Sequence, residues 1–547
     1  MVHLLDVSRA HVWGEAMTHA TTCPGCGRGT APGAAFCSTC GAALEAGATT
    51  VTLPRQPDGA PPPAAQTVPL AERPTDRRAT VPRWGSGRDL TRYLCAAAYL
   101  DRAYAGSLIK QVAAEPHLGV AAAPACDIPV VLRHAYLANA RRHSRDLVLA
   151  VLFVLAFVFT FVVGDGRITL LALFLSWVTV FSFELSTKYG RHLQSLRPDR
   201  FDPAAAPPPL NNDISTRLRQ IGDYADGNVT TYSGYSPFIG YGTELDSWSL
   251  TFDVTTSSRP EGEPEEFDVT ELYAHIAERV GTLALPCLEI EERLFTDGST
   301  LLGDTRFLPD PLGRPVSRIP FAQMDTLKRT PEEGARPYLA VHSTGWGGEL
   351  VTSLFLRFVR SDSNLFVEAV PTVLFPLLDR YRIIDTLMPR PAVGELAKLV
   401  SETAVSTFFI LLASPVRAIA GFAPDSGISR RRRRQHKLIT RLRHFDYGAR
   451  QSVRREAAAK HHQRHFQKAD SGMVLKTVEK RVLDALVEFA EARGIDVGEL
   501  IQRQQTIINN GIIASHGSRV DSSAVASGDR SRTAMNIIHK IPLLKLD

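Results

Sequence analysis

Residues 147–163 read LVLAVLFVLAFVFTFVV, and residues 168–183 read ITLLALFLSWVTVFSF. The first run has no charged residue, and its only polar side chain is that of Thr160. At about 1.5 Å per residue, each run would form a helix about 24–26 Å long, close to the thickness of a bilayer's hydrocarbon core. Only residues 164–167, Gly-Asp-Gly-Arg, separate the two runs. The sequence therefore predicts a transmembrane hairpin of two helices within residues 146–185.

A pair of buried core helices is the alternative to this hairpin. Neither run, however, carries the polar stripe of a helix on the surface of a soluble domain. Basic residues flank the hairpin on both sides, whereas its connection holds one Arg and one Asp. By the positive-inside rule, we expect both termini in the cytoplasm. The flanking basic residues are Arg133, Arg141, Arg142, Arg145, Lys188, Arg191, Arg197 and Arg200.

A cysteine cluster lies upstream, where residues 23–40 read CPGCGRGTAPGAAFCSTC. Two Cys-x-x-Cys-Gly knuckles ten residues apart are typical of a structural Zn²⁺ site with four thiolate ligands. A rubredoxin-like iron site is the alternative, because a tetrahedral sulfur cage accepts either metal. Four protein ligands leave no open position for catalysis. The expected ligands are Cys23, Cys26, Cys37 and Cys40.

This cysteine pattern, with Phe36 before the second knuckle, resembles the short zinc ribbons at the N-terminus of many bacterial membrane proteins. Together with the hairpin, it resembles an uncharacterised family of bacterial zinc-ribbon-containing membrane proteins. The resemblance covers about the first 200 residues and implies a location in the bacterial cytoplasmic membrane. It implies no known activity. Met17 is an alternative start of the chain, so residues 1–21 are interpreted as a leader that need not be native.

Composition and periodicity divide the chain further. Prolines crowd residues 51–82 and predict an extended, semi-rigid linker. Residues 88–112 and 129–145 have apolar side chains at helical spacing. The expected segments are a leader (1–21), zinc ribbon (22–44), Pro-rich linker (45–87), helical juxtamembrane segment (88–145), transmembrane hairpin (146–185), juxtamembrane linker (186–210), cytosolic α+β domain (211–395), interfacial or core helix (396–422), polybasic helical segment (423–470), amphipathic helices (471–504) and β tail (505–547).

The predicted fold class is a multidomain α+β membrane protein. Within the cytosolic domain, residues 248–255 alternate as WSLTFDVT, which is typical of a half-buried strand, and residues 267–280 have a helical pattern. Residues 285–294 form a further expected strand. Residues 351–360 and 365–374 flank a polar turn and predict a β-hairpin.

A segment rich in glycine and aromatic residues, GNVTTYSGYSPFIGYG, spans residues 227–242. We interpret it as a loop packed on its own domain. The alternative is a groove for a peptide or another ligand, because aromatic rings supply contact area and glycines permit close approach. The side chains that would line such a groove are Tyr232, Tyr235, Phe238 and Tyr241.

A polybasic block follows an apolar stretch. Residues 403–420, TAVSTFFILLASPVRAIA, contain Pro415 and Arg417 and are interpreted as an interfacial or core helix rather than a span.

Residues 430–468 then hold fourteen Lys and Arg residues but two acids, a formal charge of +12 in a chain whose net charge is +5. Next to an anchor, such a block favours anionic lipid headgroups; nucleic acid and a solvated surface are the alternatives. The candidate contacts are Arg430, Arg431, Arg432, Arg433, Arg434, Lys437, Arg441, Arg443, Arg454 and Arg455.

The C-terminal region begins with an amphipathic helix over residues 476–493, followed by a short helix to Gln504. Paired isoleucines around Asn510-Gly511 then predict a β tail, as a hairpin or an edge that pairs with another chain. This tail is a candidate oligomerisation element.

No phosphate-binding loop, dinucleotide-binding turn, zinc-protease helix or nucleophile elbow occurs in the chain. The sequence therefore favours a non-enzymatic, membrane-tethered assembly or regulatory protein that binds an unidentified protein partner and anionic lipid. The first alternative is a membrane-tethered nucleic-acid-binding protein that uses the ribbon and the basic block. The second is an enzyme of unrecognised class, which would need a buried polar cluster within residues 211–395.

Overall fold

The fold is taken from a computed structural model, and the structure describes residues 21–22, 29–30, 88–259, 262–422 and 424–513. The chain divides into two compact units, residues 1–78 and 79–547. In the first unit, β1 (Thr21–Thr22) and β2 (Gly29–Thr30) pair in antiparallel fashion. The predicted zinc ligands Cys23, Cys26, Cys37 and Cys40 lie outside the described residues.

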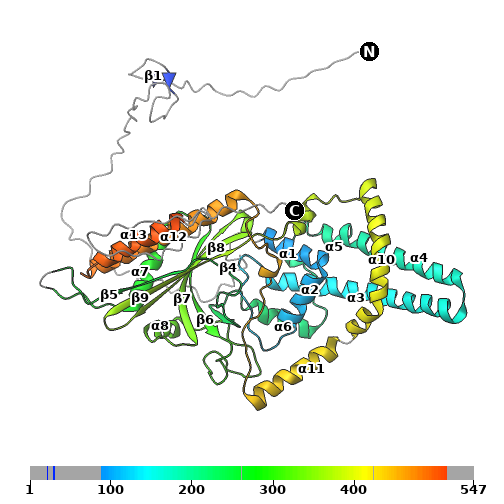
Figure 1. The fold of residues 1–547 in the computed structure, drawn as a ribbon, viewed down its shortest axis with the longest axis horizontal. Helices are drawn as coiled ribbons and strands as arrows, with labels where there is room; N and C mark the ends of the chain where they lie inside the picture. Colours follow the sequence, from blue (N-terminus) through cyan, green and yellow to red (C-terminus); the bar gives the residue numbers. More distant parts are fainter. Residues whose placement is uncertain (1–20, 23–28, 31–87, 260–261, 423, 514–547) are drawn as a thin grey trace, which may run out of the picture. The chain divides into compact units, whose positions relative to one another are not determined.

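A mixed sheet of seven strands forms the centre of the second unit, in the order β3-β6-β7-β8-β9-β4, with β5 also paired to β9 (Figure 1). The pair β3–β6 is parallel and the other pairs are antiparallel. The α+β class is thereby confirmed. The strands are β3 (Val229–Tyr232), β4 (Thr243–Glu244), β5 (Trp248–Asp253), β6 (Leu288–Asp297), β7 (Ala335–Gly345), β8 (Leu350–Arg360) and β9 (Asn364–Leu374).

The predicted strands and the predicted hairpin are found at the expected places. In β5, Leu250 and Phe252 are buried while the residues between and after them are exposed, as the alternating pattern indicates. Strands β8 and β9 pair from Val351–Leu374 to Arg360–Leu365 around a short turn. In this turn the Ser361 amide donates to the Asn364 carbonyl at 2.8 Å, which closes the hairpin.

Helices cover one face of the sheet. They are α7 (Val269–Gly281), α12 (His465–Ala492) and α13 (Gly498–Ile513). Val478, Val482 and Leu486 of α12 are buried with the apolar side chains of β7 and β8, such as Val341 and Leu356. The amphipathic helix expected from the sequence therefore packs on the sheet, although the sheet ends about ninety residues earlier in the chain.

The predicted β tail is wrong over the residues that the structure describes. Helix α13 continues to Ile513, through Asn510 and Gly511. Its buried Leu500 and partly buried Ile507 pack against the sheet's helical layer, so tertiary packing favours the helix. An Asn-Gly pair indicates a hairpin only where strands flank it, and here it lies in the last turns of a helix. Residues 514–547 lie outside the described residues.

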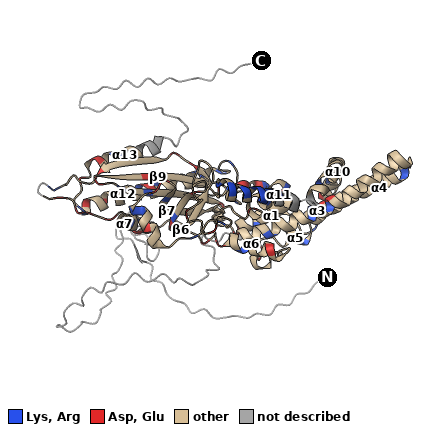
Figure 2. Ribbon diagram, turned by 90° about the horizontal axis from the view of Figure 1, so that it is seen from below, with Lys and Arg blue, Asp and Glu red and all other residues tan. Residues whose placement is uncertain are grey.

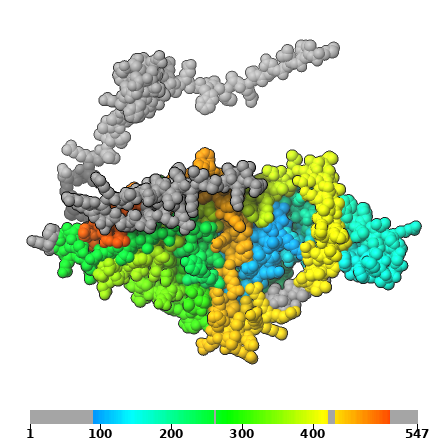
Figure 3. Space-filling model, viewed as in Figure 1, coloured from blue at the N-terminus to red at the C-terminus, as the bar shows by residue number. Residues whose placement is uncertain are grey.

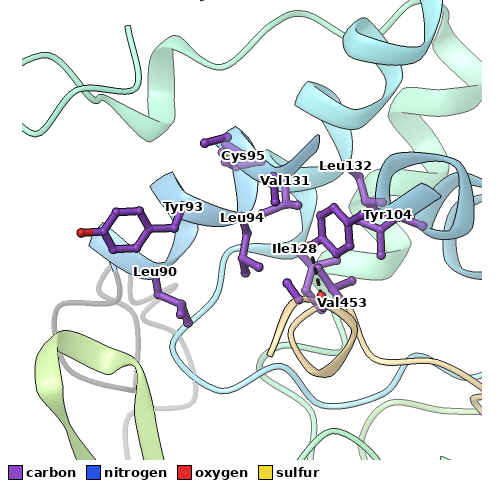
Figure 4. Close-up of a cluster of buried hydrophobic side chains, with 14 of the residues drawn as sticks. Leu90, Tyr93, Leu94, Cys95, Tyr104, Ile128, Val131, Leu132 and Val453 are labelled. Carbon is purple, nitrogen blue, oxygen red and sulfur yellow. Dashed lines mark hydrogen bonds between the residues drawn. The ribbon is translucent and has the colours of Figure 1, made fainter. Parts of the chain in front are cut away.

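A second core lies in a helical body formed by the segments around residues 88–145 (Figure 4). Leu94 and Tyr104 pack there against Val131, and the Tyr104 hydroxyl donates to the Val453 carbonyl at 3.1 Å. Its elements are α1 (Arg88–Leu100), α2 (Arg102–Leu108), the π-helical η1 (Ile109–Ala113), the first half of α3 (Ile128–Val158), α5 (Arg191–Gln194), η3 (Pro203–Ala205) and α6 (Asn212–Gly222).

Helix α3 is continuous from this body into the first apolar run. Asp127 caps its first turn by accepting a hydrogen bond from the Val130 amide at 3.1 Å. Pro129 follows, where its missing N–H costs nothing. The helix passes into η2 (Phe159–Val163), and α4 (Gly166–Lys188) returns beside it. The two predicted apolar helices are thus present as a hairpin (Figure 1).

Within the described residues, three helices are long and apolar enough to cross a membrane: Ile128–Val163, Gly166–Gln194 and Val393–Ala420. This is one more than the two expected from the sequence. The third belongs to α10 (Val393–Phe422), for which the sequence predicts an interfacial or core helix. Pro415 does not end it. Proline cannot donate to the Leu411 carbonyl, and the Ser414 hydroxyl donates to that oxygen instead at 2.7 Å.

The remaining elements connect these layers. They are α8 (Phe321–Arg329), η4 (Trp346–Gly348), η5 (Asp379–Arg382), α9 (Ile383–Thr386), α11 (Pro424–Lys437), the π-helical η6 (Leu438–Leu442) and η7 (Arg455–Ala457).

Replacing Leu486 by Ala tests whether α12 belongs to the core of the sheet. The side chain is fully buried, so Leu486→Ala should cost about 2–5 kcal/mol of unfolding free energy. The apparent Tm of the full chain in detergent should fall by several degrees. Leu245→Ala, at a position that is 40% exposed, is the matched control and should leave Tm nearly unchanged. Equal effects of the two substitutions would contradict the packing of α12.

Candidate functional site

The α3–α4 hairpin exposes a large apolar surface. Such a surface on a folded unit marks contact with lipid or with another protein. Phe161 and Val162 near the tip are 73% and 75% exposed, and Leu170 of α4 is 69% exposed. Large exposed apolar side chains continue along both helices, among them Val148, Val151, Val154, Leu155, Phe157, Val163, Leu171, Leu173, Phe174 and Leu175.

Helix α10 crosses this hairpin near its base instead of running along it (Figures 1 and 2). Leu411 of α10 is buried against Leu149 of α3 and Val180 of α4. Figure 3 shows α10 in yellow as a band between the blue helical body and the cyan hairpin. The opposite side of α10 carries exposed apolar residues at helical spacing, namely Val405, Phe408, Phe409, Leu412, Val416 and Ile419.

Helix α11 carries the arginine run and is held to the helical body through one buried carboxylate. Arg431 forms an ion pair with Glu115 at 2.7 Å, and the Gln435 amide donates to the other carboxylate oxygen at 2.6 Å. Glu115 is only 2% exposed, so its charge needs these partners. Arg431 and Gln435 are one helical turn apart and therefore share the docked face.

The other basic side chains of α11 lie elsewhere on its surface, and Figure 2 shows the helix dense in Lys and Arg. Arg432 is half-buried. Arg430, Arg433, Arg434 and Lys437 are exposed, and Arg441 and Arg443 follow as exposed residues beyond the helix. The arginine run thus combines a docked side with a solvent-facing basic side, which we call the α11 basic surface and define as Arg430, Arg433, Arg434, Lys437 and Arg441.

Arg454 does not belong to this basic surface. It is 0% exposed, and its guanidinium donates to the Pro124 carbonyl at 2.6 Å and the Glu349 carbonyl at 2.8 Å. Burial lowers the pKa of Arg454 to about 10. Its neighbour Arg455 is exposed. Arg454 ties the segment after η6 to the helical body and to the start of β8, a role that no sequence pattern distinguishes from a surface arginine.

The four aromatic side chains of the Gly-rich segment do not line a common groove. Tyr241 is fully buried and stacks on His342, with ring centroids 5.2 Å apart. Phe238 is also buried and stacks on Phe355 at 4.4 Å. Tyr235 is 98% exposed, and Tyr232 is half-buried in β3. The first part of the segment thus belongs to the sheet as β3, where the sequence predicts a loop, and the residues after β3 form a loop packed on the same sheet, as predicted.

Two glycines allow this loop to lie in close contact with the backbone of neighbouring segments. Gly240 and Gly242 have φ angles of 97° and 103°, which side chains rarely adopt. A Cβ at Gly240 would lie 2.0 Å from the Ala122 carbonyl oxygen, and one at Gly242 would lie 2.1 Å from the Val373 carbonyl oxygen.

Beneath the loop lies a row of polar side chains on adjacent strands, which no sequence motif predicts. His342 of β7 lies opposite Ser353 of β8, with its Nδ1 2.7 Å from the Ser353 hydroxyl. The His342 Nε2 atom is 3.4 Å from Glu291 of β6, which also pairs with Arg293 at 2.7 Å. Each of the three strands contains several polar residues, so the sequence does not single out these ones, and strand pairing brings them together.

The row contains the residue types of a Ser–His–acid catalytic triad, but Ser353 and His342 are both 0% exposed. Nucleophilic catalysis needs space beside the hydroxyl for a carbonyl substrate. The Tyr241 ring occupies the face of His342, and Phe355 packs beside both rings. The geometry therefore supports a structural role, in which the row holds the Gly-rich loop on the sheet.

Burial and ion pairing determine which side chains in this row are charged. Burial lowers the pKa of His342 below its usual value, although Glu291 beside it favours the proton. Burial works against ionisation of Glu291 as well, but the Arg293 guanidinium and His342 hold the pKa of that carboxyl well below its usual range. The row consequently contains a neutral imidazole beside a Glu–Arg ion pair at neutral pH.

Among the described residues, no group of three or more His, Cys, Asp and Glu side chains is arranged to hold a metal ion. The described cysteines Cys95, Cys126 and Cys287 are free thiols. Burial raises the pKa of Cys126 and Cys95, which keeps both protonated.

Acidification should destabilise the fold through His342. The unfolded imidazole takes up a proton below a pKa of about 6.5, whereas the folded one resists it, so stability is lost as pH falls through that value. The apparent Tm should therefore fall between pH 7.5 and 5.5.

The Tm of the His342→Gln variant should fall less than that of the wild type over this pH range, because the substitution removes the titrating group. His461→Gln, at an exposed position, should retain the wild-type fall. If His342→Gln and the wild type had equal pH dependence, the assignment to His342 would be wrong.

The C-terminal half of the chain has a recognisable family pattern. The model of the AbeC-like domain matches residues 247–521, which begin just before β5 and include α10, α11 and α12. The match lies outside the first 200 residues, on which the resemblance to zinc-ribbon membrane proteins rested. No curated protein and no solved structure matches the chain. Since the family model covers half of the 547 residues, the chain belongs to the AbeC-like domain family.

Proposed function

We propose that this protein is a non-enzymatic, membrane-anchored assembly or regulatory protein whose sheet domain is held at an anionic membrane surface. The observation that carries the proposal is that α3 begins in the buried helical body and ends in the exposed apolar hairpin. Exposing such an extended apolar surface to water is unfavourable, whereas burying it in lipid is favourable. One continuous helix thus couples the soluble part rigidly to the anchor.

We propose that α3 and α4 span the bilayer and that α10 lies in the plane of its cytoplasmic interface. The crossing of α10 over the base of the hairpin supports this arrangement (Figure 3). Its exposed apolar face, including Phe408 and Phe409, suits the boundary between headgroups and acyl chains. Both termini then lie in the cytoplasm of a bacterial cell, and the short connection at Gly164–Gly166 lies outside.

We propose that the α11 basic surface contacts anionic headgroups. Helix α11 follows α10 directly in the chain, and its exposed cations include Arg433, Arg434 and Lys437. Each basic residue near an anionic surface contributes roughly 1 kcal/mol. Docking through Glu115 presents these cations on a rigid helix. Nucleic acid is the alternative ligand of the same surface, since phosphate oxygens are common to both.

The four cysteines Cys23, Cys26, Cys37 and Cys40 remain the proposed ligands of a structural Zn²⁺ ion. Their Cys-x-x-Cys spacing supports this proposal. In this scheme the ribbon, tethered by the Pro-rich linker, is a contact module for a protein partner.

A reporter enzyme that is active only outside the cytoplasm tests the topology. Fused to the C-terminus it should be inactive, because two spans return the chain to the cytoplasm. Inserted after Gly164, at the tip of the hairpin, it should be active. If α10 crossed the membrane as a third span, the C-terminal fusion would be active, and the in-plane assignment would fail.

Hydrogen exchange of the full chain in nanodiscs tests the lipid contact. In discs with 30% phosphatidylglycerol, the amides of α11 should exchange about tenfold or more slowly than in pure phosphatidylcholine, because lipid contact stabilises the helix. Replacing Arg433, Arg434 and Lys437 by Gln should abolish this difference. High salt should also abolish it.

The matched control replaces three arginines on other exposed surfaces, Arg219, Arg259 and Arg336, and should retain the difference. Equal exchange in both lipids would contradict the proposed contact. Protection of α11 by added RNA or DNA in neutral discs, without protection by phosphatidylglycerol, would favour the nucleic-acid alternative.

A further inference from the structure

A small basic cavity of about 200 Å³ lies at the base of the hairpin, between the end of α1, the start of α2, and α3 and α4. Arg142 and Arg145 line it from α3, and Phe183, Glu184 and Lys188 line it from α4. Arg142 and Arg145 lie shortly before the apolar run that starts at Leu147, and Glu184 and Lys188 lie shortly after the run that ends at Phe183. In the proposed orientation, this is the depth of the lipid headgroups.

Positive charge exceeds negative charge at this cavity. Its lining includes four cations, since Arg102 joins Arg142, Arg145 and Lys188, but only one carboxylate, that of Glu184. The buried Asp146 pairs with Arg102 at 2.8 Å and with Arg145 at 2.7 Å. With both carboxylates counted against the four cations, the formal balance is +2.

Arg142 provides the main evidence for a ligand in this cavity. It is 6% exposed, and its Nη2 donates to the Tyr99 carbonyl at 2.5 Å. Its Nη1 is buried without a hydrogen-bond partner, and no ion pair joins Arg142 to a carboxylate among the described residues. A buried guanidinium without a counter-ion is costly. A phosphate would supply the missing charge, and its oxygens match the planar fork of donors.

Neighbouring groups shape the rest of the site. The Arg145 guanidinium lies over the Phe183 ring at 4.6 Å, and both side chains line the cavity. Lys188 lies 3.8 Å from Glu402 of α10, a loose pair that leaves it able to contact a ligand. Arg417 of α10 also interacts electrostatically with Arg102, Asp146 and Arg145. The field at the cavity therefore attracts an anion.

We infer that this cavity binds the phosphate group of one anionic phospholipid, with Arg142 and Lys188 as its principal contacts. The inference rests on the proposed membrane anchoring and deepens it, because it adds a discrete lipid site to the diffuse attraction of α11. The volume accommodates a phosphate with part of its headgroup, while the acyl chains would extend along the exposed apolar faces of α3 and α4.

Native mass spectrometry of the full chain in detergent tests the site. With added phosphatidylglycerol, a complex of the protein with one lipid should form and remain bound after the detergent is removed in the gas phase. Phosphatidylcholine should bind about tenfold more weakly. Lys188→Gln and Arg142→Gln should each weaken phosphatidylglycerol binding about tenfold, the change expected for one lost charge-assisted hydrogen bond. Lys188 is 34% exposed in its side chain, so Lys188→Gln keeps the test valid if Arg142→Gln fails to fold.

Arg191→Gln is the matched control. It removes one exposed charge three residues beyond Lys188 and should leave binding unchanged. Inorganic phosphate at millimolar concentration should not displace the lipid; displacement would identify free phosphate as the ligand and overturn the lipid assignment.

Equal binding of phosphatidylglycerol by the wild type and by Lys188→Gln would also overturn the site. This result is distinguishable from failure of the anchoring proposal, because the hydrogen-exchange difference at α11 and the topology of the reporter fusions do not depend on Lys188.

Discussion

The structure depends on the continuity of α3 between two environments. Its first half is buried in the helical body, where Val131 and Leu132 are inaccessible, and its second half exposes valine and phenylalanine side chains. No irregular backbone separates the halves before η2. Because a helix bends little, the position of the apolar hairpin is tied to the position of the core that surrounds the first half of α3. The crossing of α10 and the site of the basic cavity both follow from this geometry.

Basic residues of the same type have three different surroundings in this chain. Arg433 and Arg434 are exposed on α11. Arg454 lies in the core and donates to backbone carbonyls. Arg142 is buried with one donor group unpaired. The free energy of a guanidinium depends on its desolvation and its partners, so these residues differ in function although they look alike in a charge count.

The two faces of the sheet are covered by parts of the chain that are distant from each other in sequence. Helix α12 covers one face, and the loop with Gly240 and Gly242 covers the other above the row of Glu291, His342 and Ser353. Strand register alone brings His342 to Ser353, since cross-strand neighbours are set by pairing and not by spacing. His342 and Ser353 of this polar row are fully buried under the loop, and the Tyr241 ring of the loop stacks on His342, so the row stabilises one arrangement of the loop.

Local patterns were sufficient for the helices of the hairpin, the strands β5, β8 and β9 and the helical character of residues 476–493. Each of these elements depends on the periodicity of its own side chains, which the chain order already contains. The extent of α10 beyond Pro415, the helical rather than β conformation of residues 505–513, the burial of Arg454 and the contact of His342 with Ser353 were decided by tertiary structure. In each case the deciding partner is remote or nonlocal: the hairpin for α10, the sheet layer for α13, the Pro124 and Glu349 carbonyls for Arg454 and a neighbouring strand for His342. Contact free energies between distant residues depend on which surfaces meet in space, and a sequence read segment by segment does not contain that information.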